Sequence, residues 1–229
     1  MPILVVFEGK IPSPLTTVSS QYYTTLQTLL KHQAGFISET PYLSIDQPGQ
    51  QVLIAEFTDE AALHAWRKQH THLLIEAKSR SDVFVDYRIR SGAEVVVDGV
   101  DVVEDGGSED DDVGKKGTTT GSVGKYLLLR QFGSLPESSA SGPGEDSRLV
   151  PFDAWTSLVD AATYQGEKLL QITSWRTLSD ASMVRKMMSS IEGTDARLIC
   201  VERDYGKYHR EEAPADADER QTEALGADV

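Results

Sequence analysis

Residues 51–66 read QVLIAEFTDEAALHAW, and within them the pattern changes from that of a strand to that of a helix. Gln51–Phe57 is largely apolar and is typical of a buried strand. Thr58-Asp59-Glu60 follows the strand pattern directly and is predicted to provide an N-cap. Apolar residues then recur at helical spacing, so we predict one long helix over Glu60–Ser79.

Similar signals on either side complete a structural unit. Ile3–Glu8 predicts a first strand, Thr17–Gln33 a helix, and Phe36–Ile45 a second strand. The intervening turn, Asp46–Gly49, contains a proline that fixes φ and a glycine that accepts positive φ. Val83–Arg90 predicts the last strand. This order, β-α-β-β-α-β, is that of the split βαβ, ferredoxin-like unit.

The same transition from strand to helix recurs in the second half of the chain. Ser174–Ala181 reads SWRTLSDA and occupies the place that EFTDEA has in the first unit. The second unit therefore looks like a looser copy of the first. Its predicted elements are strands at Tyr126–Phe132, Ala161–Tyr164, Lys168–Trp175 and Asp195–Asp204, a short helical stretch at Phe152–Val159, a helix at Leu178–Ser190, and a loop over 133–148.

A four-stranded sheet with two helices on one face leaves its other face bare, and an apolar face of this kind must meet another sheet. Two units in one chain can meet this need internally. We therefore predict an α+β fold of two tandem ferredoxin-like (split βαβ) halves that form a dimeric-type α+β barrel within one chain, as a monomeric pseudo-dimer or a homodimer. The expected parts are a first half (1–95), an acidic linker (96–123), a degenerate second half (124–210) and a disordered acidic tail (211–229).

The chain has 229 residues, with 22 Lys and Arg against 36 Asp and Glu, a formal charge of −14. Eight acidic residues lie within 98–112 and seven within 211–229, which is typical of solvated linkers and tails. With no basic stripe to offset this charge, we predict no nucleic-acid binding. No apolar run approaches the ~20 residues of a membrane span, and the N-terminus lacks the basic region of a signal peptide. A single cysteine, Cys200, fits a reducing, cytoplasmic setting.

The residues best suited to chemistry lie in the second predicted helix of the first half. On an unbroken helix Trp66 and His70 face the same side, while His72 lies about 120° from Trp66. Histidine exchanges a proton near neutral pH, so each imidazole is a candidate base. The alternative is that Trp66 is a core residue and that both histidines lie at its boundary. Histidines at i and i+2 face different sides of a helix, so we predict no metal site.

Several short motifs resemble those of the antibiotic biosynthesis monooxygenase (ABM) family of dimeric α+β barrel proteins. They are Gly35-Phe36-Ile37, the Pro-Gly turn, Ala65-Trp66-Arg67 with His72 six residues after the tryptophan, DYRIR at 86–90, VERDYG at 201–206 and EEAPAD at 211–216. The resemblance covers residues 1–92 well and 126–216 partly. It implies the barrel fold and a cofactor-independent oxygenase, whose electron-rich aromatic substrate is deprotonated and itself reduces O₂. The family commonly has proline where this chain has His70.

By position, the resemblance implies one site per chain, on the first half. The implied catalytic residues are His72 as the base, Tyr87 as a hydroxyl donor and Arg90 as a partner for an anion. The resemblance implies Trp66 as a wall on which the substrate stacks. The further candidate substrate-binding residues are His70, from its place on the helix, and Tyr22 and Tyr42. No flavin, haem or metal is expected, and the partners are a small aromatic or polyketide molecule and O₂. A cyclase or isomerase that uses the same pocket, and a non-catalytic binding or scaffold protein, stay open as alternatives.

Overall fold

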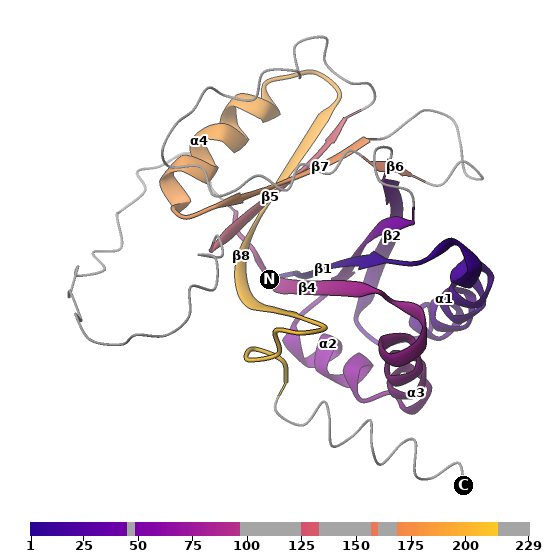
Figure 1. Cartoon of the computed structure of the whole chain (residues 1–229). Coiled ribbons are helices and arrows are strands. Elements are labelled where there is room, and N and C mark those ends of the chain that lie inside the picture. Colours follow the sequence, from indigo (N-terminus) through magenta and orange to yellow (C-terminus); the bar gives the residue numbers. More distant parts are fainter. Residues whose placement is uncertain (45–48, 97–124, 133–156, 160–168, 215–229) are drawn as a thin grey trace, which may run out of the picture.

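The computed structural model describes residues 1–44, 49–96, 125–132, 157–159 and 169–214 (Figure 1). The strands within these ranges are β1 (Ile3–Lys10), β2 (Phe36–Ser44), β3 (Gln50–Phe57), β4 (Asp86–Glu94), β5 (Tyr126–Phe132), β6 (Ser157–Val159), β7 (Leu169–Trp175) and β8 (Thr194–Gly206). The helices are α1 (Thr16–Leu30), α2 (Glu60–Arg67), α3 (His70–Lys78) and α4 (Leu178–Ser189), with a 3₁₀ turn η1 (Ser13–Leu15) and a π-helical turn η2 (Ser79–Val83). Among these, no helix has the length and apolar content needed to cross a membrane.

The strands close into one barrel in the order β1-β3-β2-β6-β7-β5-β8-β4. The first four strands form an arc ordered β4-β1-β3-β2, and the last four form an arc with the same internal order, β8-β5-β7-β6. The arcs meet where β2 pairs with β6 and where β4 pairs with β8, both antiparallel. Helices α1, α2 and α3 lie outside the first arc and α4 outside the second (Figure 1). The predicted barrel of two ferredoxin-like halves is therefore confirmed.

The pairing registers place an approximate two-fold axis between the halves. The halves can be aligned by matching β1 with β5. Residues that pair with matched positions of these two strands are then counterparts, and Ala93 is the counterpart of Cys200. These two residues pair with each other across β4 and β8. In the same way, Leu43 and Leu158 are counterparts and pair across β2 and β6. A residue pairs with its own counterpart only on a two-fold axis, so the halves are related like the subunits of a symmetric dimer.

Apolar side chains pack on both sides of the barrel wall. The interior cluster draws on both halves and comprises Leu4, Val6, Tyr42, Val52, Ile54, Leu127, Leu129, Leu170, Ile172 and Ile199. Outside the first arc, α1 and α2 bury a cluster of Ile3, Leu30, Ala55, Phe57, Leu63 and Trp66. Outside the second arc, α4 buries Leu128, Trp175, Ala181, Ala196 and Leu198. The shared interior makes each half the cover of the other half's bare sheet face.

The long helix predicted over Glu60–Ser79 is broken in the structure. α2 begins as expected, because the Asp59 side chain accepts a hydrogen bond from the backbone N of Ala62. Gln69 is extended (φ −66°, ψ 123°), and its side chain accepts a hydrogen bond from the backbone N of His72 at 2.6 Å. Gln69 is therefore the N-cap of a second helix, α3. The break changes which side chains face the sheet.

Other elements also differ from prediction in type or in boundary. Ser157–Val159, predicted as the end of a helical stretch, is strand β6, because the barrel needs a strand between the open edges of β2 and β7. The last strand of the first half begins at Asp86, because the chain stays helical through Val83. Gly49 has the positive φ, 82°, that the predicted turn requires. The predictions for residues 46–48, for the linker from 97 on, and for 133–148, 152–156, 161–164 and 215–229 fall outside the described residues.

Two counterpart arginines link the halves inside the barrel. The register alignment makes Arg197 in β8 the counterpart of Arg90 in β4. Arg90 donates a hydrogen bond to Ser174 in the second half at 3.1 Å, and Arg197 donates to Glu56 in the first half. Ser174 and Glu56 are themselves counterparts. Each arginine therefore reaches across the interface, and the two-fold relation extends to this polar pair.

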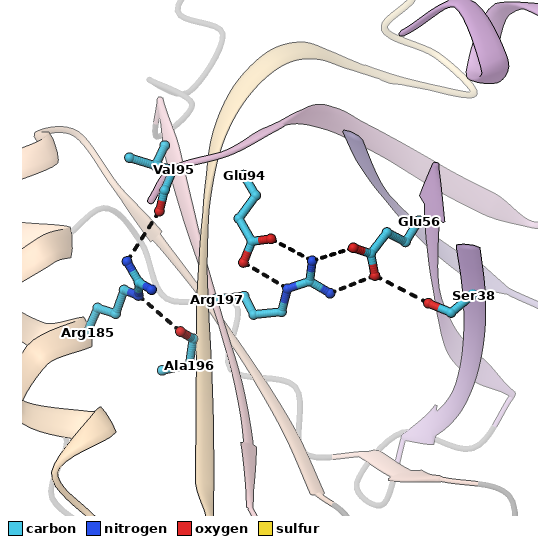
Figure 2. A network of polar contacts seen from close by, with 7 residues as sticks. All are labelled: Ser38, Glu56, Glu94, Val95, Arg185, Ala196 and Arg197. Atoms are coloured by element: carbon cyan, nitrogen blue, oxygen red, sulfur yellow. Dashed lines mark hydrogen bonds and ion pairs between the residues drawn. The ribbon is translucent and has the colours of Figure 1, made fainter. Parts of the chain in front are cut away.

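Arg197 is at the centre of a network of polar contacts (Figure 2). Its nitrogens donate to both oxygens of Glu94 and to both oxygens of Glu56, at 2.7 and 2.9 Å in each case. Ser38 also donates to Glu56, at 3.3 Å. These bonds raise the pKa of Arg197 and lower that of Glu56. Nearby, Arg185 of α4 donates to two backbone carbonyls, which ties its helix to β8 and to the end of the first half.

Candidate active site

A row of polar residues lies along α3 and η2. His72, Glu76 and Arg80 follow one another at intervals of four residues, so they lie along one side of the helical segment. Burial is the main influence on the pKa values of His72, Tyr87 and Tyr205, and the charge of Glu76 acts on all three. The imidazole and the two phenols therefore lie within electrostatic range of one carboxylate.

His72 lies beside Trp66, with ring centroids 4.6 Å apart and a tilt of 42°. The side chain as a whole is half-buried, but its Nδ1 atom is shielded from solvent and has no hydrogen-bond partner among the described residues. Burial lowers the pKa of His72, and it outweighs the opposing charge of Glu76; the charge of Arg67 and the N-terminal position in α3 also disfavour the cation. His72 is therefore a neutral base at neutral pH.

Two buried tyrosines line the outer face of the barrel below this row. Tyr205 in β8 pairs with Ile89 in β4, and Tyr87 is two residues from Ile89, so both phenols point to the same side. The Tyr87 ring stacks on Phe7 at 6.0 Å and meets Phe84 edge-on at 6.1 Å. Burial raises the pKa of both tyrosines, that of Tyr205 to about 12. Both hydroxyls therefore keep their protons at neutral pH and can donate hydrogen bonds.

Arg210 contacts both phenols, and the charge of Arg67 acts on Tyr205. Arg210, in the segment after β8, donates from Nη1 to the hydroxyl oxygen of Tyr87 at 2.9 Å, and its guanidinium carbon lies 6.0 Å from the centre of the Tyr205 ring. Arg67 in α2 donates to the Ser91 hydroxyl at 3.3 Å, and only 12% of its side chain is exposed. Cations in a shielded site favour negative charge on a nearby oxygen. The cluster thus combines a base, hydroxyl donors and positive charge.

Two predicted site residues lie on the other side of the sheet. Arg90 is three residues after Tyr87, and successive strand residues face opposite sides, so its side chain enters the barrel, where it is 1% exposed. Tyr42 is also inside the barrel, where its hydroxyl accepts a hydrogen bond from Gln131 and burial raises its pKa to about 12. The prediction that His72, Tyr87 and Arg90 share one slot is therefore wrong for Arg90, and Tyr42 does not line that slot.

The break in the helix decides where the remaining predicted residues lie. His70 is exposed at the start of α3, although an unbroken helix would have turned it toward Trp66. Tyr22 is half-buried on α1, one turn before Leu26, which packs against the apolar cluster that contains Trp66. Trp66 itself is 8% exposed. It has a packing role in that cluster as well as its contact with His72.

Sequence reasoning missed Glu76, Tyr205 and Arg210. Glu76 could have been found, because a residue four positions after His72 lies on the same side of a helix. Tyr205 lies within the ending that carried the family resemblance, and Arg210 directly precedes its last motif. Nothing in the sequence shows that this ending packs beside β4. Its place is set by the β4–β8 pairing.

The described part of the second half has no counterpart of α3. Asp59 and Thr177 are N-caps at counterpart positions, and this alignment makes Val184 the counterpart of Trp66. Eighteen residues (68–85) separate α2 from β4, whereas four residues (190–193) separate α4 from β8. Those four residues leave no room for a helix that could carry the polar row. The cluster therefore exists once among the described residues.

Among the described residues, no group of three His, Cys, Asp or Glu side chains is close enough to hold a metal ion. A small hollow beside Arg197 has a volume of about 20 Å³ and is lined by Leu4, Ile54, Leu129, Gln131, Asp195 and Arg197. This is below the roughly 300–1,000 Å³ of a typical ligand site.

Comparison with known proteins agrees with the fold and the motifs. The family model described as antibiotic biosynthesis monooxygenase matches residues 6–77. The chain is 30% identical over 220 residues to a protein of Pyricularia oryzae named jasmonate monooxygenase ABM, and the match covers 92% of this chain and 95% of that protein. The identity extends through both halves.

Among solved structures, SnoaB from Streptomyces nogalater, a cofactor-independent oxygenase, is 16% identical and covers 42% of this chain and 95% of its own (TM-score 0.37). Rv0793 from Mycobacterium tuberculosis is 17% identical and covers 43% and 100% (TM-score 0.39). A putative monooxygenase from Fusobacterium nucleatum is 8% identical and covers 89% and 93% (TM-score 0.36). Likeness at this level carries no conclusion about activity. On the strength of the relative that matches nearly its whole length, this chain belongs to the antibiotic biosynthesis monooxygenase family.

Proposed function

We propose that this chain is a cytoplasmic, cofactor-independent monooxygenase that acts on an aromatic or polyketide intermediate of secondary metabolite biosynthesis. The observation that carries the proposal is the neutral His72 imidazole, which packs against Trp66 and shares one cluster with the buried hydroxyls of Tyr87 and Tyr205. The cluster supports this chemistry because it offers a flat apolar wall, a base, and donors for an oxygen that becomes negative.

In the proposed reaction, His72 removes a proton from an acidic C–H or O–H group of the substrate. The resulting carbanion or phenolate is electron-rich and reduces O₂ directly. For an anthrone-like methylene group, one oxygen atom of O₂ becomes the new carbonyl oxygen, and the other leaves as water with the two methylene hydrogens. The substrate supplies all four electrons, so the balance closes without an external reductant.

The tyrosines have the complementary role in this proposal. Their hydroxyls keep their protons at neutral pH because burial raises their pKa values. They can therefore donate to the substrate oxygen that gains negative charge when His72 takes the proton. A donor aimed at such an oxyanion typically contributes about 10²–10³ in rate.

Three features of the proposal have specific alternatives. Because the Pyricularia oryzae relative is named for jasmonate, jasmonate belongs in the substrate panel beside anthrone-like compounds. A cyclase or isomerase would use the same base and donors without O₂. The place of Trp66 in a packed apolar cluster favours a non-catalytic binding protein, because packing alone accounts for a buried tryptophan. The barrel closes within one chain, so a monomer is sufficient to form the barrel.

The experiment follows dissolved O₂ and substrate loss together, with purified protein treated with a chelator. His72→Ala should lower turnover by about 10²–10⁴, the usual effect of removing a general base. His64→Ala is the matched control, because His64 is an exposed histidine on the neighbouring helix α2. Full activity in His72→Ala would show that the base is wrong. Substrate loss without O₂ uptake would indicate a cyclase or isomerase, and loss of neither a non-catalytic protein.

A further inference from the structure

We propose that Arg210 is a positioning residue that holds the Tyr87 hydroxyl as a hydrogen-bond donor toward the substrate. The segment after the last strand of the second half would thereby complete the site on the first half. The kinetic part of this inference rests on the proposed function. The effect of Arg210 on Tyr87 does not, and it can be measured without a substrate.

The first argument is the direction of the hydrogen bond. A phenolic hydroxyl has one proton to donate and lone pairs that accept. Arg210 Nη1 donates to the oxygen of Tyr87 at 2.9 Å, so it occupies an accepting position. Arginine cannot accept a hydrogen bond, so the proton of Tyr87 must point elsewhere. A hydroxyl that accepts from a cation is also a stronger donor, because hydrogen bonds in a chain polarise one another.

The second argument is that the segment is anchored independently of Arg210. The backbone N of Lys207 donates to the Tyr87 carbonyl at 3.1 Å, and the Lys207 ammonium donates to the Phe84 carbonyl at 2.6 Å. Within the segment, the Gly206 N–H donates to the His209 carbonyl at 2.7 Å. These bonds fix the backbone that carries Arg210. Changing only its guanidinium should therefore leave the segment in place.

The third argument is electrostatic. Burial raises the pKa of Tyr87, and the positive charge of Arg210 is the largest single effect that opposes it. Two other charged groups act on Tyr87: Glu76 of α3 raises the pKa, and Arg80 of η2 lowers it both by its charge and by a side-chain hydrogen bond. Arg210 thus limits the energy needed to draw the hydroxyl proton toward a substrate oxyanion. Because arginine cannot accept a hydrogen bond, this guanidinium leaves the hydroxyl proton for another acceptor.

The inference also gives the second half a catalytic purpose. Its described residues contain no counterpart of α3, so they hold no cluster equivalent to that of the first half. They do contribute β8, which pairs with β4 and places Tyr205 beside Tyr87, and the segment that carries Arg210. The second half would then be retained for the residues it lends to the first as well as for closing the barrel.

The first test measures the Tyr87 hydroxyl directly. The full chain is labelled with 3-fluorotyrosine at its eight tyrosines, and the Tyr87 ¹⁹F signal is assigned by its loss in Tyr87→Phe. In Arg210→Gln the Tyr87 signal should titrate at a pH higher by roughly one unit, the low end of the effect of one nearby charge. Arg210→Lys should shift it less. Arg176→Gln, at an exposed arginine outside this segment, should leave it unchanged.

The second test is kinetic. Arg210→Gln should lower kcat about tenfold with little change in KM, less than the 10²–10³ expected for losing an oxyanion donor outright. Arg210→Lys should recover part of the loss. In a Tyr87→Phe background, Arg210→Gln should have no further effect, because the hydroxyl on which it acts is gone.

An unchanged Tyr87 titration in Arg210→Gln, with the fold intact, overturns the inference whatever the activity is. A shifted titration with an unchanged kcat overturns its catalytic part, and so does an equal loss in the Tyr87→Phe background. If the wild type turns over no substrate, the proposed function fails, and the titration alone decides whether Arg210 positions Tyr87. The two failures are therefore distinguishable.

Discussion

Arg197→Met should destabilise the barrel by about 3 kcal/mol, because two facing carboxylates lose their common cation. Arg197 of the second half bonds both oxygens of Glu56 and of Glu94 in the first half. Breaking a buried ion pair costs about 3–5 kcal/mol. Here the side chains of Arg197, Glu56 and Glu94 are 26%, 14% and 18% exposed, so water stabilises part of the orphaned charge and the lower figure applies. At this chain length the corresponding fall in Tm is about 6–12 °C.

The loss of stability in Arg197→Met should also depend on pH, and it should be larger at neutral pH than at acid pH. Bonding to Arg197 lowers the pKa of Glu56 in the folded protein, so the pair contributes stability above the ordinary glutamate pKa of about 4.3, and this stability is lost as pH falls through the lowered value. In Arg197→Met the facing carboxylates repel each other, and taking up a proton relieves the repulsion. The difference in unfolding free energy between wild type and variant should therefore be largest at pH 7 and shrink below about pH 5.

The assay is urea denaturation at pH 7 and at about pH 4.5. Arg176→Met is the control, since Arg176 is an exposed arginine in the same half. Adding Glu56→Gln and Glu94→Gln to Arg197→Met should restore at least half of the loss, because neutral amides do not repel. A loss below about 1 kcal/mol at pH 7, a loss that is the same at both pH values, or no rescue by the amides would each refute the reasoning.

Three further predictions follow from the site and the fold. Because burial lowers the pKa of His72, kcat/KM should stay at its plateau below the ordinary histidine pKa of about 6.5. Below that pH the unfolded state takes up a proton at His72 that the folded state does not, so the free energy of unfolding falls. In His72→Gln this fall should be smaller. Trp66→Ala should cost about 3–5 kcal/mol in denaturation and raise KM, whereas Trp66→Phe should keep most of the stability; equal stability of Trp66→Ala and wild type would contradict its packing role. Deleting 98–120 should leave Tm nearly unchanged. Strands β4 and β5 both pair with β8, so the residues that remain between β4 and β5 need to span only about two strand spacings, roughly 10 Å across the sheet. A fall in Tm of many degrees in calorimetry would show that this segment packs.

Much of the fold follows from local signals in the sequence. The apolar runs and helical spacings around residues 51–66 predict a ferredoxin-like unit, and their recurrence near Ser174 predicts a second unit and the barrel between them. These signals act within a few residues, as the N-cap of Asp59 does for α2. They fail where the cause is distant. The strand at Ser157–Val159 exists because two barrel edges need a partner, and three residues with no clear pattern cannot indicate that.

The sequence by itself also determined which helix and strand carry the candidate chemistry, since Trp66, His72 and Tyr87 come from motifs that resemble one family. Only the tertiary structure decided how they are aimed. Gln69 is a weak N-cap by composition, so the break that turns His72 toward Trp66 and leaves His70 in solvent was not evident from helical spacing. Strand alternation sent Arg90 into the barrel, and the β4–β8 pairing brought Tyr205 and Arg210 to Tyr87 across more than a hundred residues. Residue types and short spacings are local properties of a chain, whereas the faces that meet are set by long-range pairing and packing.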